Sequence, residues 1–235
     1  MKKRFYLYMT AAAVVGAIVV IGVGGCNEDT GENHYNVEKY LGRYDADGTL
    51  SYGGQTYRTV KIGGQTWMAE NMNYVPKKGN SWCYDNDPSN CAKYGRLYDW
   101  TAAMAVCPGG WRLPDTADWN TLSEKVGGTR GHLGLDYWGD TIWICAGVGK
   151  TLKSKSWNSK YNDEFGFSAL PVGSRYPDDK EGDFHSLGSG TVWFTATEMY
   201  DTNAQVRATG WGSEDLRGYG DPKYYGSSVR CLKNN

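Results

Sequence analysis

The sequence has few residues of the kinds that bind metals or form catalytic groups. Its three histidines stand far apart, at positions 34, 132 and 185, and no CxxC pair occurs. A zinc site needs closely spaced sets of such ligands, so zinc is not expected. The GxSxG and HExxH motifs are also absent. The GVGKT stretch lacks the first glycine of a phosphate loop, because that position is Ile144. We therefore expect a protein without a cofactor and without enzyme activity.

Basic charge and long apolar runs are scarce after residue 25. Residues 1–25 contain three basic residues and no acidic one, which leaves 22 basic and 26 acidic residues in the rest of the chain. A net charge near −4 gives no electrostatic footprint for nucleic acid, so no such partner is expected. No later segment reaches the about 17 to 25 apolar residues that a membrane-spanning helix needs.

The first 25 residues have the pattern of an export signal. Residues 2–4 are basic, and residues 5–25 carry no charge. The run ends in VGGC at Cys26, which is similar to a bacterial lipobox and implies cleavage before Cys26 and attachment of lipid to it. An uncleaved anchor is the alternative, because the run is near the length of a spanning helix. Asn27 follows the cysteine, which by similarity to Gram-negative lipoproteins favours the outer membrane or cell surface.

The rest of the chain divides into a tether and a domain. Residues 26–54 are largely polar, and we interpret them as a flexible tether that holds a domain at residues 55–233 away from the membrane. The domain opens with two alternating segments, residues 56–62 and Gln65–Met68, separated by a Gly-Gly pair. This pattern predicts a β-hairpin.

Two helices should follow the hairpin. Residues 97–106 combine good helix formers with apolar residues on one side. The second helix should begin at Thr116, after the stretch CPGGWRLPDTADW. Asp115 can accept hydrogen bonds from its first turn, while Trp119 and Leu122 should face the core. From residue 165 onward, short segments resemble strands, so the whole pattern predicts an α+β domain.

Export permits disulfides, and five cysteines remain if Cys26 carries lipid. Cys83 and Cys91 enclose a turn-rich loop and are the first expected pair. Cys107 and Cys231 are the second, because one begins the central CPGGWRLP stretch and the other lies at the end of the chain. The remaining cysteine, at position 145 in an apolar run, is expected to be a buried free thiol.

Calcium and sugar ligands are the candidate small partners. Asp85 and Asp87, together with Asp163, could offer oxygens to calcium, although turn formation explains the same residues without a metal. The chain has 10 Trp and 18 Tyr against 5 Phe. Aromatic rings stack on the apolar faces of sugars with little loss of rotamer freedom, although packing alone also explains most rings. The candidate ligand-binding rings, all in loop-rich regions, are Trp138, Tyr176, Tyr200, Trp211, Tyr219, Tyr224 and Tyr225.

The motifs VKIGGQTWMAENMNY, WCYDNDPSNCAKYGRLYDW, CPGGWRLPDTADW, DEFGFSALPVGSRY, VWFTATE and SSVRCLK resemble the Fibrobacter succinogenes major paralogous domain. They stand in the order of that family from about Thr56 to Lys233. The resemblance implies a surface or secreted bacterial domain, often on a lipoprotein, and it supports both disulfide pairs. Between residues 129 and 145 the chain departs from the family pattern, as if by an insertion.

The segment WRLPDTADW also resembles, more distantly, the sulfatase-modifying family, a relative of the C-type lectin fold. This resemblance implies a C-type-lectin-like frame. The oxidase chemistry of that family depends on a late cysteine pair, whereas here only Cys231 lies late, so the activity is not expected. Carboxylates at residues 178–183 run along what looks like a solvated loop. We therefore expect a non-enzymatic, lipid-anchored surface protein that binds polysaccharide or another surface ligand. The alternative is an envelope assembly component that binds a protein partner.

Overall fold

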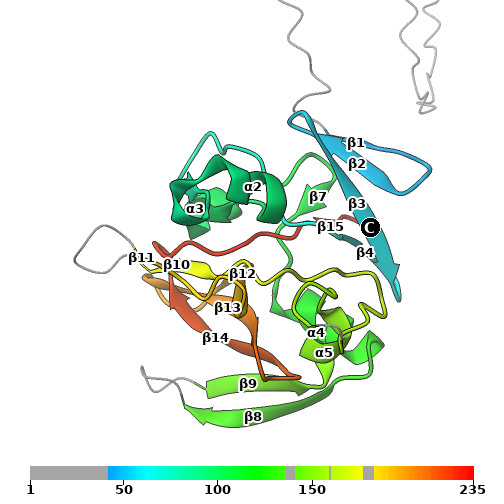
Figure 1. Ribbon diagram of the computed structural model, residues 1–235, viewed down its shortest axis with the longest axis vertical. Helices are drawn as coiled ribbons and strands as arrows, with labels where there is room; N and C mark the ends of the chain where they lie inside the picture. Colours follow the sequence, from blue (N-terminus) through cyan, green and yellow to red (C-terminus); the bar gives the residue numbers. More distant parts are fainter. Residues whose placement is uncertain (1–41, 136–140, 159, 177–182) are drawn as a thin grey trace, which may run out of the picture. The chain divides into compact units, whose positions relative to one another are not determined.

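The computed structural model describes residues 42–135, 141–158, 160–176 and 183–235. These residues form an α+β domain dominated by antiparallel sheets, which confirms the expected class (Figure 1). Its sheets comprise one of six strands, one of five strands and two pairs of short strands. The export signal and Cys26 lie outside the described residues.

The six-stranded sheet is built around the predicted hairpin. Strands β3 (Gln55–Ile62) and β4 (Gln65–Met68) pair antiparallel, and Gly63 in the turn has a φ of +60°, which favours glycine. This confirms the hairpin. Strand β15 (Leu232–Lys233) pairs with β4 and with β7 (Trp111–Arg112). The end of the described chain therefore lies beside the β3–β4 hairpin.

Two strands lie within the segment that was expected to be a tether. Strands β1 (Arg43–Tyr44) and β2 (Thr49–Tyr52) extend the six-stranded sheet, and β2 pairs with β3. Leu50 and Tyr52 are buried in the hydrophobic core. Their apolar surface is removed from water only if this segment is ordered. The folded region therefore begins before residue 55, and the expected boundary was too late.

The five-stranded sheet has the order β12-β13-β14-β9-β8. Its first three strands in this order come from the C-terminal part of the chain. They are β12 (Gly190–Glu198), β13 (Asn203–Gly210) and β14 (Leu216–Pro222). Strands β8 (Thr129–Leu135) and β9 (Thr141–Ala146) form a hairpin that pairs with β14. The described residues of the stretch predicted to be an insertion thus lie at the edge of this sheet.

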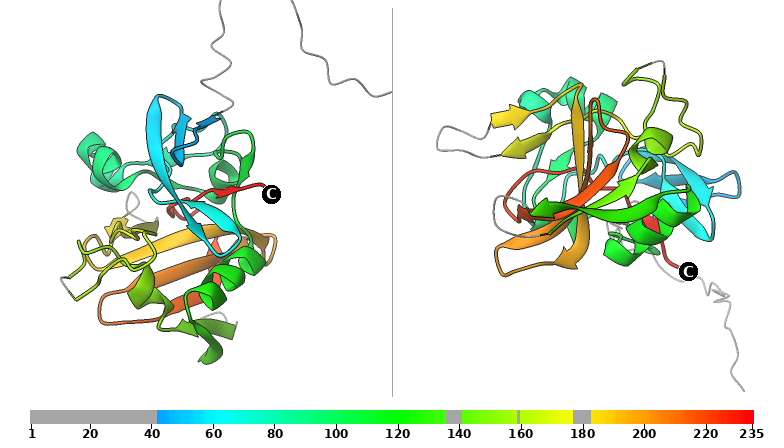
Figure 2. Two further views of the ribbon diagram at one scale, coloured as in Figure 1. Left: turned by 90° about the vertical axis from the view of Figure 1, so that its right-hand side faces the viewer. Right: turned by 90° about the horizontal axis from the view of Figure 1, so that it is seen from below.

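Helix α4 (Thr116–Lys125) lies against one face of the five-stranded sheet (Figure 2). The Asp115 carboxylate accepts a hydrogen bond from the Asp118 backbone N–H at 2.9 Å, and the Asp118 carboxylate accepts one from the Asp115 N–H at 2.8 Å. This capping box satisfies two free donors of the first turn. Trp119 and Leu122 are fully buried. The helix, its cap and its buried face are therefore as predicted.

The other expected helix is much shorter than predicted. Residues Leu97–Tyr98 form strand β6, which pairs with β5 (Ser81–Trp82), and only α3 (Trp100–Ala103) is helical. The Tyr98 backbone exchanges two hydrogen bonds with Ser227, at 2.8 and 3.0 Å. These tertiary hydrogen bonds override the local helix propensity of the segment.

Three short helical elements were not predicted. Helix α2 (Pro88–Tyr94) lies within the first disulfide loop, with Asp87 as its N-cap and proline at its first position, and a 3-10 turn (Tyr84–Asn86) precedes it. Helix α5 (Val148–Leu152) follows β9. Strands β10 (Ser174–Tyr176) and β11 (Asp183–His185) form the remaining pair.

Both expected disulfides are present. Cys83 bonds to Cys91, and Cys107 bonds to Cys231 across 124 residues of sequence. Cys145 is a buried free thiol, as predicted. The long bridge joins the segment before α4 to the segment before β15, so it closes most of the domain into one covalent loop.

A buried cation joins the sheets in the interior. The Arg230 guanidinium donates hydrogen bonds to Asn71 Oδ1 at 2.7 Å and to the Ser168 carbonyl at 2.9 Å, and it also bonds to the Met68 and Phe167 carbonyls. Burial lowers its pKa to about 9. Its hydrogen bonds are made to neutral oxygen atoms, which compensate for the loss of water.

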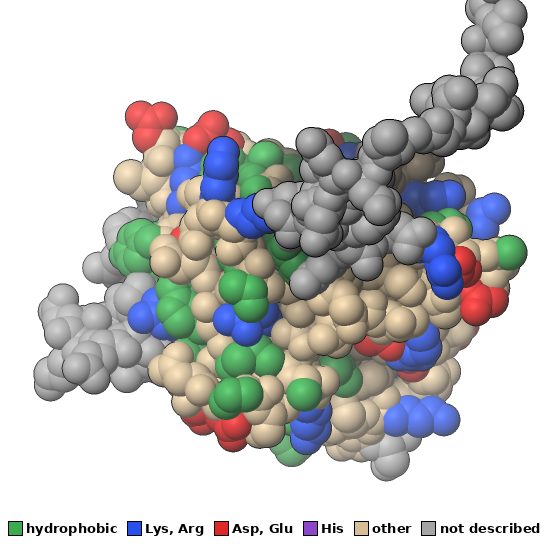
Figure 3. Space-filling view, turned by 90° about the horizontal axis from the view of Figure 1, so that it is seen from above, with side chains coloured by type: hydrophobic (Ala, Val, Ile, Leu, Met, Phe, Trp, Pro, Cys, Tyr) green, Lys and Arg blue, Asp and Glu red, His purple; other side chains and the backbone are tan. Residues whose placement is uncertain are grey.

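The surface seen in Figure 3 carries basic side chains interspersed with acidic ones, and its apolar side chains lie in small groups. Within the described ranges, no helix has both the length and the apolar character needed to cross a membrane.

Candidate functional site

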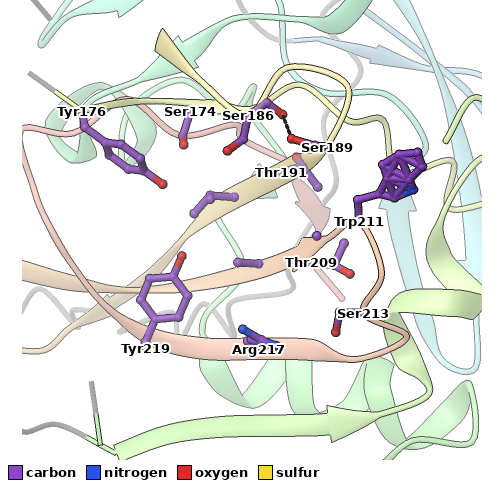
Figure 4. Close-up of a pocket in the computed structure, with 14 residues that line it drawn as sticks. Ser174, Tyr176, Ser186, Ser189, Thr191, Thr209, Trp211, Ser213, Arg217 and Tyr219 are labelled. Atoms are coloured by element: carbon purple, nitrogen blue, oxygen red, sulfur yellow. Dashed lines mark hydrogen bonds between the residues drawn. The ribbon is translucent and has the colours of Figure 1, made fainter. Parts of the chain in front are cut away.

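A pocket of about 250 Å³ lies on the face of the five-stranded sheet that α4 does not cover (Figure 4). Val192 and Ala208 are cross-strand partners, as are Ala208 and Arg217, so these residues share one face. Their neighbour Trp193 points to the opposite face and packs against Trp119. We call this cavity the hydroxyl pocket. Its walls are formed by Ser174, Tyr176, Ser186, Ser189, Gly190, Thr191, Val192, Ala208, Thr209, Gly210, Trp211, Ser213, Arg217 and Tyr219.

Three of the candidate aromatic residues meet at this pocket. Tyr176 on β10 and Tyr219 on β14 project their hydroxyl groups toward one another, and Trp211 stands at the other end (Figure 4). The Trp211 side chain is 59% exposed, so its ring is open to a ligand. The sequence separates these residues by up to 43 positions, and the sheet brings them together.

Two further candidates continue from the pocket. The ring of Tyr225 lies 4.9 Å from that of Tyr176, and the ring of Tyr224 lies 5.1 Å from that of Tyr225. Tyr200 lies in the turn between β12 and β13 and is not part of the pocket wall. Trp138 lies outside the described residues.

Six serine and threonine residues line the same pocket, a feature that the sequence did not reveal. They come from three separate segments of the chain, at residues 174, 186–191 and 209–213, so no local motif joins them. The buried Oγ1 atom of Thr191 has no hydrogen-bond partner among the described residues. A buried hydroxyl without a partner costs free energy.

The two tyrosines of the pocket remain protonated at neutral pH. Burial raises the pKa of Tyr176, while a hydrogen bond with Ser174 opposes the increase. Burial raises the pKa of Tyr219 well above its ordinary value, and the nearby Asp221 carboxylate raises it further. A protonated phenol both donates and accepts hydrogen bonds. The pocket therefore presents neutral donor and acceptor groups, and Arg217 is the one basic residue among the described residues of its wall.

A buried lysine positions the turn that carries Trp211. The Lys153 ammonium donates hydrogen bonds to the carbonyls of Gly210 and Ser213, both at 2.7 Å. The side chain is fully buried, and desolvation lowers its pKa to about 8. The backbone N–H of Trp211 also donates a hydrogen bond to the Ser189 carbonyl at 2.6 Å. Nothing in the sequence near Lys153 distinguishes it from the neighbouring lysines.

The family model described as the Fibrobacter succinogenes major domain matches residues 60–233, which include the whole hydroxyl pocket. The chain belongs to this family. A search of curated proteins and a search of solved structures each found no significant match. The description of the Fibrobacter succinogenes major domain family names no ligand.

Two of the three calcium candidates of this family member are engaged in local hydrogen bonds. The Asp87 carboxylate accepts from the Ser89 N–H at 2.9 Å and caps α2, and the Asp163 carboxylate accepts from the Ser168 N–H at 2.7 Å. Asp85 lies in the 3-10 turn with a φ of +53°. Among the described residues, no group of three or more His, Cys, Asp or Glu side chains is placed to hold a metal ion. The carboxylates at 178, 179 and 181 lie outside the described residues.

Proposed function

We propose that this domain binds a polyhydroxylated ligand, such as a polysaccharide, in the hydroxyl pocket without catalysing a reaction. The observation that carries the proposal is the meeting of Tyr176, Trp211 and Tyr219 around six serine and threonine residues. Aromatic faces stack on the apolar faces of sugar rings, and protein hydroxyls exchange hydrogen bonds with sugar hydroxyls. Neutral phenols suit an uncharged ligand of this kind.

We propose further that the protein is exported and anchored by lipid at the outer membrane or cell surface of a Gram-negative bacterium. Support comes from the basic residues 2–4, the uncharged run to residue 25 and the VGGC sequence at Cys26. The two disulfides suit an oxidising compartment. An anchored binding domain would face ligands at the cell envelope.

A C-type-lectin-like frame is proposed as the finer description of the fold. It is supported by the segment WRLPDTADW, which forms β7 and the capped start of α4. It is also supported by the long disulfide that ties this segment to the end of the domain. An experimental structure would test this proposal by its superposition on lectin domains.

Retention on insoluble xylan and cellulose, together with a glycan array, tests the ligand proposal. The wild-type protein should be retained, and Trp211→Ala should weaken retention severalfold, as expected for loss of a ring contact worth about 0.5 to 1.5 kcal/mol. Tyr200→Ala is the matched control, because Tyr200 is 54% exposed and lies outside the pocket wall. Equal retention of wild type and Trp211→Ala, or none above a denatured sample, would refute sugar binding at this pocket.

The second candidate function is assembly with a protein of the envelope. It is favoured by exposed apolar side chains outside the hydroxyl pocket, among them Met104 and Tyr200. Crosslinking in cells followed by mass spectrometry separates the two functions. One dominant protein neighbour that is lost in Tyr200→Ala, with retention on glycans absent, would favour assembly.

A further inference from the structure

A second pocket, of about 320 Å³, lies on the opposite face of the same sheet, beside α4. We call it the arginine pocket. Arg207 on β13 and Arg130 on β8 both line it, as do Trp143 on β9 and Asn120 on α4. Neighbouring positions on a strand point to opposite faces, so Arg207 and its neighbour Ala208 face different pockets. The two cavities are therefore separated by the sheet itself.

The Arg207 guanidinium fits into space left by a glycine in the wall of the arginine pocket. Its side chain is only 5% exposed, and its cross-strand partner is Gly218. A Cβ atom at position 218 would come within 2.6 Å of Arg207 Nη1, so the missing side chain of glycine makes room for the guanidinium. Gly218 has an ordinary backbone φ, which means that this room, and not backbone freedom, is what glycine supplies.

The Arg207 guanidinium is only partly satisfied by the protein. Nη1 donates to the Val206 carbonyl at 3.0 Å, and Nη2 makes a long bond of 3.4 Å to Asn120 Oδ1. A guanidinium has five donors. Within the described part of the chain, no carboxylate forms an ion pair with Arg207. A buried cation without a counter-ion is costly, because burial removes water from the charge.

Arg130 adds a second positive charge to the same cavity. Its guanidinium stacks on the Trp143 ring at 4.3 Å, and no described carboxylate pairs with it either. Burial, together with a smaller contribution from the charge of Arg130, lowers the pKa of Arg207 to about 10. Glu198 also lines the cavity, but its carboxylate is already paired with Lys223. The described residues therefore supply no carboxylate that pairs with either Arg207 or Arg130.

We propose that the arginine pocket binds an oxyanion group, such as a carboxylate, sulfate or phosphate, between the guanidinium groups of Arg207 and Arg130. Guanidinium groups match the paired oxygens of these anions, and charge-assisted hydrogen bonds are roughly twice as strong as neutral ones. The exposed edge of Trp143 would contact the carbon frame of a ligand that carries the anion. This site does not depend on the hydroxyl pocket. The arginine pocket would bind a charged group, whereas the hydroxyl pocket would bind neutral hydroxyl groups.

Isothermal titration of the full-length protein tests the site. Sodium sulfate, sodium phosphate and sodium glucuronate are titrated separately, with ionic strength held constant by sodium chloride. At least one should bind saturably. Binding of the inorganic ions alone would indicate a free or ester-linked anion as the source, and binding of glucuronate alone would indicate an acidic sugar.

Three variants locate the binding. Arg130→Gln should raise the dissociation constant at least tenfold, or about 1.4 kcal/mol. Gly218→Ala should do the same by displacing the Arg207 guanidinium, with Arg130 intact. Arg43→Gln is the matched control, since it removes an exposed arginine on β1 that lines neither pocket and should leave the constant unchanged.

Folding failure is separable from loss of the site. Arg130 is exposed, so the Arg130→Gln variant should unfold at the wild-type temperature in sodium chloride alone. The proposal is overturned if none of the three anions binds saturably to the wild-type protein. It is also overturned if Arg43→Gln weakens binding as much as Arg130→Gln does, because general surface charge would then account for the effect.

Discussion

The two faces of the five-stranded sheet carry different chemistry on the same strands. On β13, Ala208 belongs to the hydroxyl pocket and Arg207 to the arginine pocket. Burial acts on both faces in the same physical direction, because it disfavours the charged form of any group. It raises the pKa of the phenol of Tyr219 and lowers that of the guanidinium of Arg207. One face therefore keeps neutral donors, whereas the other holds a cation that needs an anion.

The coverings of the two faces also differ. Helices α4 and α5 contribute Trp119 and Leu152 to the cluster with Trp193 on one face. On the other face, Phe194 packs in the cluster that includes Val229 and Cys231 from the end of the chain. One face thus packs against helices α4 and α5, and the other packs against the C-terminal segment that is held by a disulfide.

Removal of the long disulfide is expected to have the largest effect. Cys107→Ser combined with Cys231→Ser releases a loop of 124 residues, which in the chain-entropy model lowers the free energy of unfolding by about 4 to 5 kcal/mol. Because the C-terminal segment packs on the Phe194 face, retention on xylan should fall before sulfate binding does. Urea unfolding with both binding assays measures this. A loss below 1 kcal/mol would show that packing alone holds the segment.

Truncation of neighbouring core residues compares the faces directly. Trp193→Ala and Phe194→Ala should each lower the free energy of unfolding by about 3 to 5 kcal/mol, because both side chains are fully buried. The binding effects should separate, with Trp193→Ala weakening sulfate binding and Phe194→Ala weakening retention on xylan. Chemical unfolding and the two binding assays test this. Loss of both activities in both variants would mean that the faces are not independent.

The pH dependence of Lys153 should give the smallest effect. Its pKa is about 8 in the folded protein and has an ordinary value of 10.5, so the unfolded chain binds more protons between these pH values. Stability from this residue therefore rises with pH across the window, on the order of 1 kcal/mol per pH unit. Wild type should gain this much relative to Lys153→Met in urea unfolding at pH 8 and pH 9.5.

The exposed Lys150 provides the control for this measurement. Lys150→Met should differ from wild type by an amount that stays the same at both pH values. Lys153→Met should also loosen the turn that carries Trp211 and weaken retention on xylan. A pH-independent difference between wild type and Lys153→Met would contradict the depressed pKa.

Features with local causes could be predicted from the sequence. The β3–β4 hairpin follows from strand alternation around a Gly-Gly turn, and α4 follows from its Asp115 cap and its buried Trp119 face. The short helix α3 was overestimated, because backbone hydrogen bonds from Ser227 draw Tyr98 into a strand. Such hydrogen bonds link residues more than 100 positions apart and leave no local signal.

The candidate sites were only partly visible in the same way. Tyr176, Trp211 and Tyr219 could be named as candidate rings, but their meeting at one pocket could not be predicted. Neither Lys153 nor Arg207 stands out in the sequence, since surface lysines and arginines are common. Their significance comes from burial, which depends on every segment that covers them.

By itself, the sequence determined the α+β class, both disulfide pairs, the β3–β4 hairpin and α4. Each depends on composition, short spacing or a family pattern that lies along the chain. The tertiary structure alone decided which residues share a face of the five-stranded sheet. Strand alternation separates neighbours such as Arg207 and Ala208, and cross-strand pairing joins distant residues such as Arg207 and Gly218. The register between strands therefore sets the chemistry of each pocket.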